Sequence, residues 1–214
     1  MNFFDINNIF FKIFEYNLSY LEFFGVITGI LAVYIASREK VINFYIGIIN
    51  IVLYAAFFYQ LQLYSMMMLQ AVYFVINIYG IYTWTKRNSN RQTIKITALK
   101  NRHRAYLFLT VCVVAAVWAY FVINVSAKFP QYIEKPLYPY IDALITIASI
   151  AAQILLTRKK IDNWVIWLIV DSASVILFLV MSSYFTAILY GCYTVIGTNA
   201  LLAWRKNFKN TDLE

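Results

Sequence analysis

Charged side chains are scarce in this chain. Only 13% of its 214 residues are Asp, Glu, Lys or Arg, whereas 62% are hydrophobic and 19% are aromatic. A soluble domain needs about a quarter of its residues charged to cover its surface. Too few polar residues remain here to face water, so lipid must be the solvent for much of the surface. The composition excludes an ordinary soluble domain, and the apolar runs predict an all-α membrane protein.

Residues suited to covalent or metal chemistry are equally few. Cys112 and Cys192 lie in apolar runs without disulfide or metal spacing, so we interpret them as small buried hydrophobes. The single histidine, His103, belongs to a basic stretch and is expected to be solvated. No Walker-type Gly-rich loop with Lys is present, so the chain does not hydrolyse ATP, and we expect no cofactor. A membrane enzyme would need several convergent titratable groups at membrane depth, and the sequence does not supply them.

Seven segments are long and apolar enough to cross a bilayer, which takes about 20 residues. They are residues 19–37, 41–61, 64–84, 105–127, 138–157, 163–182 and 184–204. The connections after the second and sixth segments are nearly absent and predict tight hairpins. Residues 1–18 lack the features of a signal peptide. Their Phe and Ile, spaced among polar residues, predict an interfacial amphipathic helix, with a disordered tail as the alternative.

The placement of positive charge predicts the orientation. If the segments alternate, one side holds all of the 18 Lys and Arg except Lys12, Lys128 and Lys135. Cytoplasmic loops carry the excess of Lys and Arg, so we expect an outside N-terminus and a cytoplasmic tail at 207–214, in a bacterial inner membrane. The basic run at 86–104 is then an anchor to anionic lipid headgroups rather than a nucleic-acid surface.

The chain also contains an internal repeat. At an offset of 120 residues, 37–86 aligns without gaps with 157–206. Identical pairs include Asn43/Asn163, Tyr64/Tyr184, Tyr73/Tyr193 and Trp84/Trp204, and Glu22 aligns with Asp142. The pattern predicts a 3+1+3 parallel repeat, with three-helix repeats at 19–84 and 138–206 and a linker helix at 105–127. Parallel repeats with a midplane site between them are one transporter plan, and a duplicated scaffold is the alternative.

Polar and aromatic residues within the spans indicate a binding site. Asp171 lies near mid-depth of the sixth span, and Trp164 and Trp167 precede it on one helical stripe. Two indole faces and a carboxylate suit a flat cationic ring. For Trp164, an ordinary interfacial belt residue is the alternative.

Two further spans carry candidates. Gln70, Tyr73 and Asn77 share a face of the third span, and Tyr190 and Tyr193 share a face of the seventh. Interhelical hydrogen bonding is the alternative role for each of them.

The stretch from Asn163 to Asp171 resembles the W-x-x-W-x-x-x-N/D signature of the PnuC family of bacterial nicotinamide riboside transporters. The endings Tyr79-Gly80-Ile81-Tyr82-Thr83-Trp84 and Trp204-Arg205-Lys206 are similar to that family too. The resemblance implies facilitated diffusion of nicotinamide riboside, which a cytosolic kinase traps by phosphorylation for pyridine nucleotide biosynthesis.

The resemblance also implies a homotrimer with one pathway per subunit. By motif, Trp164, Trp167 and Asp171 would contact the substrate, and Gln70 would join them. Related branches of the family carry thiamine or riboflavin. Because Asp stands where some members have Asn, thiamine and, less favoured, riboflavin stay open as alternative substrates.

Overall fold

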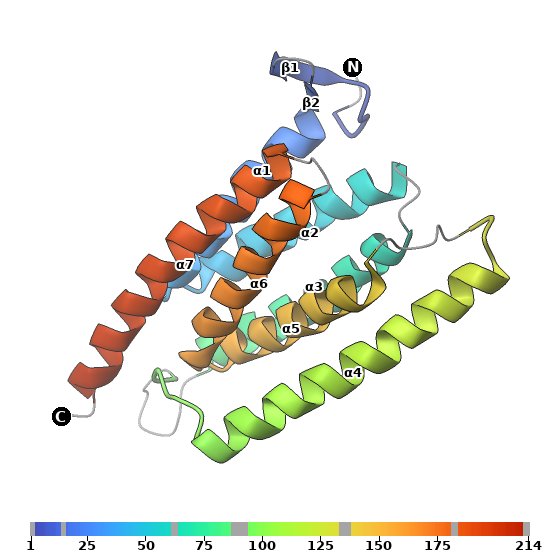
Figure 1. Ribbon diagram of the computed structural model, residues 1–214. Coiled ribbons are helices and arrows are strands. Elements are labelled where there is room, and N and C mark those ends of the chain that lie inside the picture. The colour runs from blue at the N-terminus through green and yellow to red at the C-terminus, as the bar shows by residue number, and fades with distance from the viewer. Residues whose placement is uncertain are drawn as a thin grey trace. The chain divides into compact units, whose positions relative to one another are not determined.

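The computed structural model describes residues 3–13, 16–60, 64–86, 94–132, 138–180 and 184–211. Seven helices hold most of these residues (Figure 1): α1 Tyr20–Ser37, α2 Ile42–Gln60, α3 Tyr64–Thr85, α4 Asn101–Lys128, α5 Pro139–Thr157, α6 Asp162–Val180 and α7 Tyr184–Thr211. Among the described residues, six helices are long and apolar enough to cross a membrane: α1, α2, α4, α5, α6 and α7. The predicted helical membrane class is therefore confirmed. The two tight connections, at 61–63 and 182–183, lie outside the described residues.

Helix α3, the third predicted span, is not among those six, so the count of seven spans stays a prediction. Its 22 residues are enough to cross a bilayer, but several side chains near its start lie outside the described part of the chain.

The N-terminal segment differs from the prediction. Strands β1 (Ile9–Ile13) and β2 (Tyr16–Ser19) pair antiparallel, with Lys12 opposite Asn17. The prediction of an amphipathic helix within residues 1–18 was therefore wrong. The run Ile9-Phe10-Phe11-Lys12-Ile13 is β-branched and aromatic, a composition that favours a strand. Helix α1 begins directly after β2, where Ser19 accepts a hydrogen bond from the Glu22 backbone N–H at 3.2 Å.

The chain divides into two compact units. The first holds Met1–Lys95, Thr157–Lys159 and Val195–Glu214, and the second holds Ile96–Leu156 and Lys160–Thr194. In the first unit α1 packs against α2 and α2 against α3. A Cβ added to Gly80 would lie 2.4 Å from the Phe44 ring, so the absence of a side chain there lets α3 approach α2 closely.

In the second unit α4 packs against α5. Ala115 and Ala119 of α4 and Ala143 of α5 form a buried cluster, with Ile147 against it. Small side chains permit this close contact between apolar helices.

The helix ends and cysteines refine two expectations. Helix α4 begins at Asn101 and α7 continues to Thr211, so both helices are longer than predicted. The first residues of the expected tail at 207–214 are therefore helical.

Both cysteines are free, but Cys112 is half-buried and Cys192 is exposed. The prediction that both are buried was therefore wrong.

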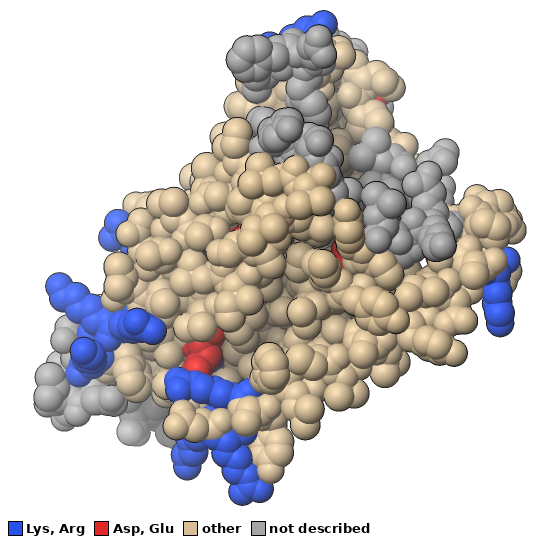
Figure 2. All heavy atoms as spheres, viewed as in Figure 1, with Lys and Arg blue, Asp and Glu red and all other residues tan. Residues whose placement is uncertain are grey.

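The outer surface is apolar. Phe108, Ile169 and Ile188 are 72%, 65% and 66% exposed. Figure 2 shows few Lys, Arg, Asp or Glu side chains over most of the face in view. Such a surface fits lipid rather than water, as the composition indicated.

Candidate substrate-binding site

The predicted stripe on α6 is the buried face of that helix. Trp164 and Asp171 are only 2% and 5% exposed, and Trp167 is half-buried. On the other side of the helix, Val165 and Ile169 are exposed. The carboxylate and the two indoles therefore point away from the lipid-facing side, as a substrate site requires.

The start of α6 is held by an ion pair. Arg104 Nε lies 2.6 Å from Asp162 Oδ1, and the Leu99 backbone N–H donates to Asp162 Oδ2 at 2.7 Å. The Ile161 N–H also donates to the Thr97 carbonyl at 2.9 Å. These contacts fix the segment before α4 to the turn that precedes Trp164. The sequence analysis did not predict these contacts, because it interpreted Arg104 as one of many lipid anchors. An Asp in the first turn of a helix, such as Asp162, could have indicated a partner for a basic residue.

Tyr190 of α7 lies close to the acidic groups of the second unit. Its ring stacks on Phe178 with centroids 5.4 Å apart, and Tyr193 meets its edge at 6.0 Å. Tyr190 is also within electrostatic range of Asp171 and Asp142. Tyr190 therefore lies in the vicinity of the carboxylate of the α6 stripe, and Tyr193 packs on Tyr190. Asp142, which the sequence marked only as the repeat partner of Glu22, is an additional acidic group near the site.

The candidates on α3 belong to the first unit. Asn77 is 4% exposed, and its Nδ2 donates to the Tyr73 carbonyl at 2.8 Å. A Cβ on Gly47 would lie 2.8 Å from Asn77 Oδ1, so this carboxamide packs directly on the α2 backbone. Gln70 and Tyr73 are half-buried. These contacts give Asn77 a packing role, and its part in substrate binding, like that of Gln70 and Tyr73, stays a prediction.

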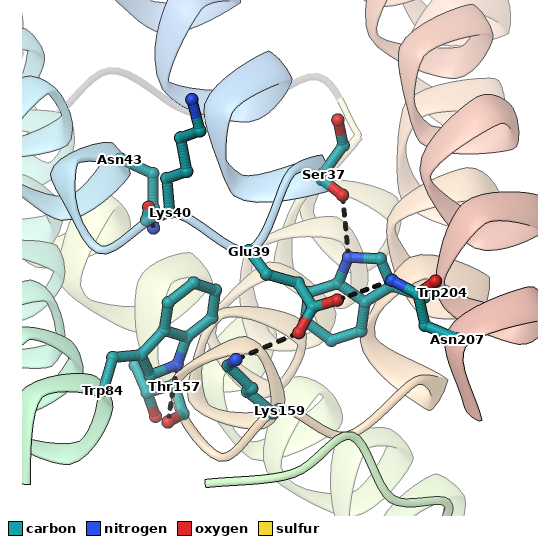
Figure 3. A network of polar contacts seen from close by, with 9 residues as sticks. All are labelled: Ser37, Glu39, Lys40, Asn43, Trp84, Thr157, Lys159, Trp204 and Asn207. Atoms are coloured by element: carbon teal, nitrogen blue, oxygen red, sulfur yellow. Dashed lines mark hydrogen bonds and ion pairs between the residues drawn. The ribbon is translucent and has the colours of Figure 1, made fainter. Parts of the chain in front are cut away.

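A second polar cluster, which we call the clasp, joins helix ends in the first unit (Figure 3). It consists of Ser37, Glu39, Trp84, Thr157, Lys159, Trp204 and Asn207. Trp84 Nε1 donates to the Thr157 carbonyl at 3.1 Å, and Trp204 Nε1 donates to the Ser37 carbonyl at 3.0 Å. Ser37 and Thr157 are 120 residues apart, as are Trp84 and Trp204. Each tryptophan therefore donates to a residue of the other half, and the two bonds join equivalent positions of the repeat.

The centre of the clasp is an ion pair. Lys159 Nζ lies 3.0 Å from Glu39 Oε2, and Asn207 Nδ2 donates to Glu39 Oε1 at 2.8 Å (Figure 3). The ammonium also lies 4.8 Å from the centroid of the Trp84 ring. The side chain of Lys159 is 9% exposed and that of Glu39 is 24% exposed. A desolvated ammonium held by a carboxylate and an indole face is a specific contact rather than a loose surface pair.

The backbone of both ion-pair residues is unusual. Glu39 has a φ of 56° and Lys159 a φ of 47°, each just after a helix end. This left-handed conformation costs roughly 1–2 kcal/mol for a residue with a side chain, and glycine is the usual occupant. After each turn, an aligned asparagine donates from Nδ2 to a carbonyl three residues back: Asn43 to Lys40 at 2.7 Å and Asn163 to Lys160 at 2.6 Å. The sequence did not single out this pair, because the aligned residues carry opposite charges and so do not count as an identity.

Comparisons with known proteins agree with this architecture. Residues 19–206 match the model of a protein family described as nicotinamide mononucleotide transporter. The chain is 33% identical to the nicotinamide riboside transporter PnuC of Escherichia coli, over 95% of this chain and 94% of that protein. It is 25% identical to the riboflavin/roseoflavin transporter RibM of Streptomyces davaonensis, over 93% of this chain and 88% of that protein.

A solved structure shares the fold. The crystal structure of the vitamin B3 transporter PnuC matches with a TM-score of 0.65 at 24% identity, and the match covers 89% of this chain and 83% of that one.

Proposed function

Because the chain belongs to the nicotinamide mononucleotide transporter family, we propose that it takes up nicotinamide riboside across the inner membrane by facilitated diffusion. The family is a family of transporters and not of enzymes. Six apolar spans among the described helices fit a multi-pass membrane protein. Phosphorylation of the riboside in the cytosol keeps its free concentration low there, so inward diffusion continues without ion coupling or ATP.

The observation that carries the proposal is the buried stripe of α6. Nicotinamide riboside has a flat cationic ring and a sugar with hydroxyl groups. Trp164 and Trp167 offer indole faces on which the ring can stack, and cation–π attraction favours its positive charge. Asp171 supplies either a countercharge or a hydrogen-bond acceptor for a sugar hydroxyl. Gln70, Tyr73, Asn77, Tyr190 and Tyr193 complete the proposed site.

The transport cycle follows from the 3+1+3 repeat. Two parallel halves that rock about a midplane site expose it to each side in turn. The reciprocal bonds of Trp84 and Trp204 and the matched backbone of Glu39 and Lys159 support this internal symmetry. With the N-terminus outside, the clasp lies at the cytoplasmic side, and the carrier forms a homotrimer in which each subunit has its own pathway.

Thiamine and riboflavin are the alternative substrates. Thiamine also presents a cationic aromatic ring, which the two tryptophans would bind equally well. Riboflavin is favoured by the similarity to RibM, but its ring system carries no positive charge for Asp171 to balance. A thermal-shift screen of the purified protein against the three vitamins, followed by uptake into proteoliposomes, separates them.

The site assignment is tested by Trp164→Ala. Loss of one stacking face should weaken binding of nicotinamide riboside by about 1–3 kcal/mol, measured by isothermal titration calorimetry. Trp118→Ala is the matched control, because Trp118 lies on α4 and is 41% exposed. Equal affinities of the Trp164 variant and the unmodified protein would show that the stripe is not the site.

A further inference from the structure

The buried stripe of α6 continues one turn beyond Asp171. Ser174 is three residues further along the helix, within about 60° of Asp171 around the axis. It is 1% exposed, whereas Ser172 between them is exposed. The order along the buried face is thus Trp164, Trp167, Asp171 and Ser174, with two aromatic groups followed by two oxygen-bearing groups.

The hydroxyl of Ser174 is buried without a hydrogen-bond partner among the described residues. Two other buried serines among the described residues are satisfied by their own helices. Ser149 Oγ donates to the Ile145 carbonyl at 2.7 Å, and Ser126 Oγ donates to the Ile123 carbonyl at 3.0 Å. Buried polar groups are nearly always hydrogen-bonded in folded proteins, so a hydroxyl that forgoes the nearby helix carbonyl needs another explanation.

We propose that Ser174 is a specificity-determining residue that hydrogen-bonds a sugar hydroxyl of the substrate; this inference rests on the proposed function. Side chains three residues apart on a helix have Cβ atoms about 5–6 Å from each other. Asp171 and Ser174 therefore present a carboxylate and a hydroxyl at a spacing suited to adjacent hydroxyls of a ribose. The carboxylate accepts, the serine both donates and accepts, and the cationic ring lies toward Trp164 and Trp167.

Placement of the sugar on Asp171 and Ser174 also explains how the carrier separates ribosides from other cationic rings. A site whose buried polar groups are satisfied only by the correct substrate rejects analogues that leave those groups unpaired. Stacking on two indoles is tolerant of ring identity and cannot supply that discrimination.

The test is Ser174→Ala, with Ser172→Ala and Ser149→Ala as matched controls. Calorimetry with nicotinamide riboside should show about a tenfold loss of affinity for Ser174→Ala, the size expected for one hydrogen bond, and none for either control. The thermal stability of the ligand-free Ser174→Ala protein should be unchanged or higher, because the substitution removes an unsatisfied hydroxyl. A lower stability with unchanged affinity would instead assign the hydroxyl to the fold and overturn the inference.

A sugar-free probe decides which part of the substrate Ser174 contacts. 1-Methylnicotinamide keeps the cationic ring and has a methyl group in place of the ribose. Its inhibition constant, measured by competition with nicotinamide riboside, should be the same for Ser174→Ala and the unmodified protein, and an equal loss for both ligands would contradict sugar recognition. If the unmodified protein binds no nicotinamide riboside, the proposed function fails. If it binds and Ser174→Ala matches it, only the role of Ser174 fails.

Discussion

Asp171 is a carboxylate that the membrane interior should penalise, yet it is 5% exposed and takes part in neither of the ion pairs found among the described residues. Ionisable groups at such positions are costly and generally serve a function. Two functions fit its position on the stripe, and they differ in which part of the substrate the carboxylate contacts. The carboxylate either balances the charge of the ring or accepts a hydrogen bond from the sugar.

Two substitutions of Asp171 distinguish these functions. Asp171→Asn removes the charge and keeps an acceptor oxygen, whereas Asp171→Ala removes both. If the residue contacts the sugar, Asn should keep the affinity for nicotinamide riboside within about threefold and Ala should lower it about tenfold or more. Calorimetry on the two purified variants gives the comparison. Equal losses for Asn and Ala would assign the residue to charge balance instead.

The residues of the stripe were accessible to sequence reasoning because helical spacing alone places them on one face. Trp164 and Asp171 needed no tertiary information, and their burial confirms the face that was predicted. The contacts of Asp162 could not be predicted from helical spacing, because its partner Arg104 is 58 residues away along the chain. Ser174 was overlooked because a single serine in an apolar helix gives no signal until its burial and missing partner are known.

At the level of elements, the repeat was visible in sequence while the clasp was not. Alignment of the halves marks Trp84 and Trp204 as equivalent, but it does not reveal that each bonds a carbonyl in the other half. The hairpin of β1 and β2 was missed for a different reason. Phe and Ile spaced among polar residues are compatible with both a helix and a strand in so short a segment.

The clasp predicts a defect in turnover rather than in binding. Lys159→Met and Glu39→Gln each remove one charge of the ion pair, which should destabilise the clasp by about 1–2 kcal/mol and, if the clasp stabilises one state of the transport cycle, slow maximal uptake about tenfold. The dissociation constant for nicotinamide riboside should stay within about twofold, because neither residue lies on the α6 stripe. Uptake into proteoliposomes and calorimetry measure the two quantities separately.

Three further variants make this prediction specific to the ion pair. Lys159→Arg keeps the charge and should retain uptake, and Lys160→Met, which alters a neighbouring half-buried cation, should have no effect. The double variant of Glu39→Gln and Lys159→Met should be no slower than either single variant, since both remove the same interaction. Additive losses would mean that Glu39 and Lys159 act independently.

For the whole molecule, the placement of Lys and Arg predicts how the chain is oriented in the membrane. If the seven predicted segments alternate, all of the 18 Lys and Arg except Lys12, Lys128 and Lys135 lie on one side. Lys and Arg in short loops are retained on the cytoplasmic side during insertion. In that orientation we expect the same charges to lie against the anionic headgroups of the inner leaflet, each stabilised by about 1 kcal/mol.

This distribution predicts that the N-terminal hairpin is outside and the end of α7 is inside. Asn7 and Lys209 are both exposed, and each can carry a single cysteine after Cys112 and Cys192 are replaced by serine. A membrane-impermeant maleimide applied to intact spheroplasts should label the Asn7→Cys protein and leave the Lys209→Cys protein unlabelled until the membrane is opened by detergent. The reverse pattern would invert the carrier and place the clasp at the outer end of the pathway. The turnover defect of Lys159→Met would then have to be assigned to a step at the outer side of the membrane.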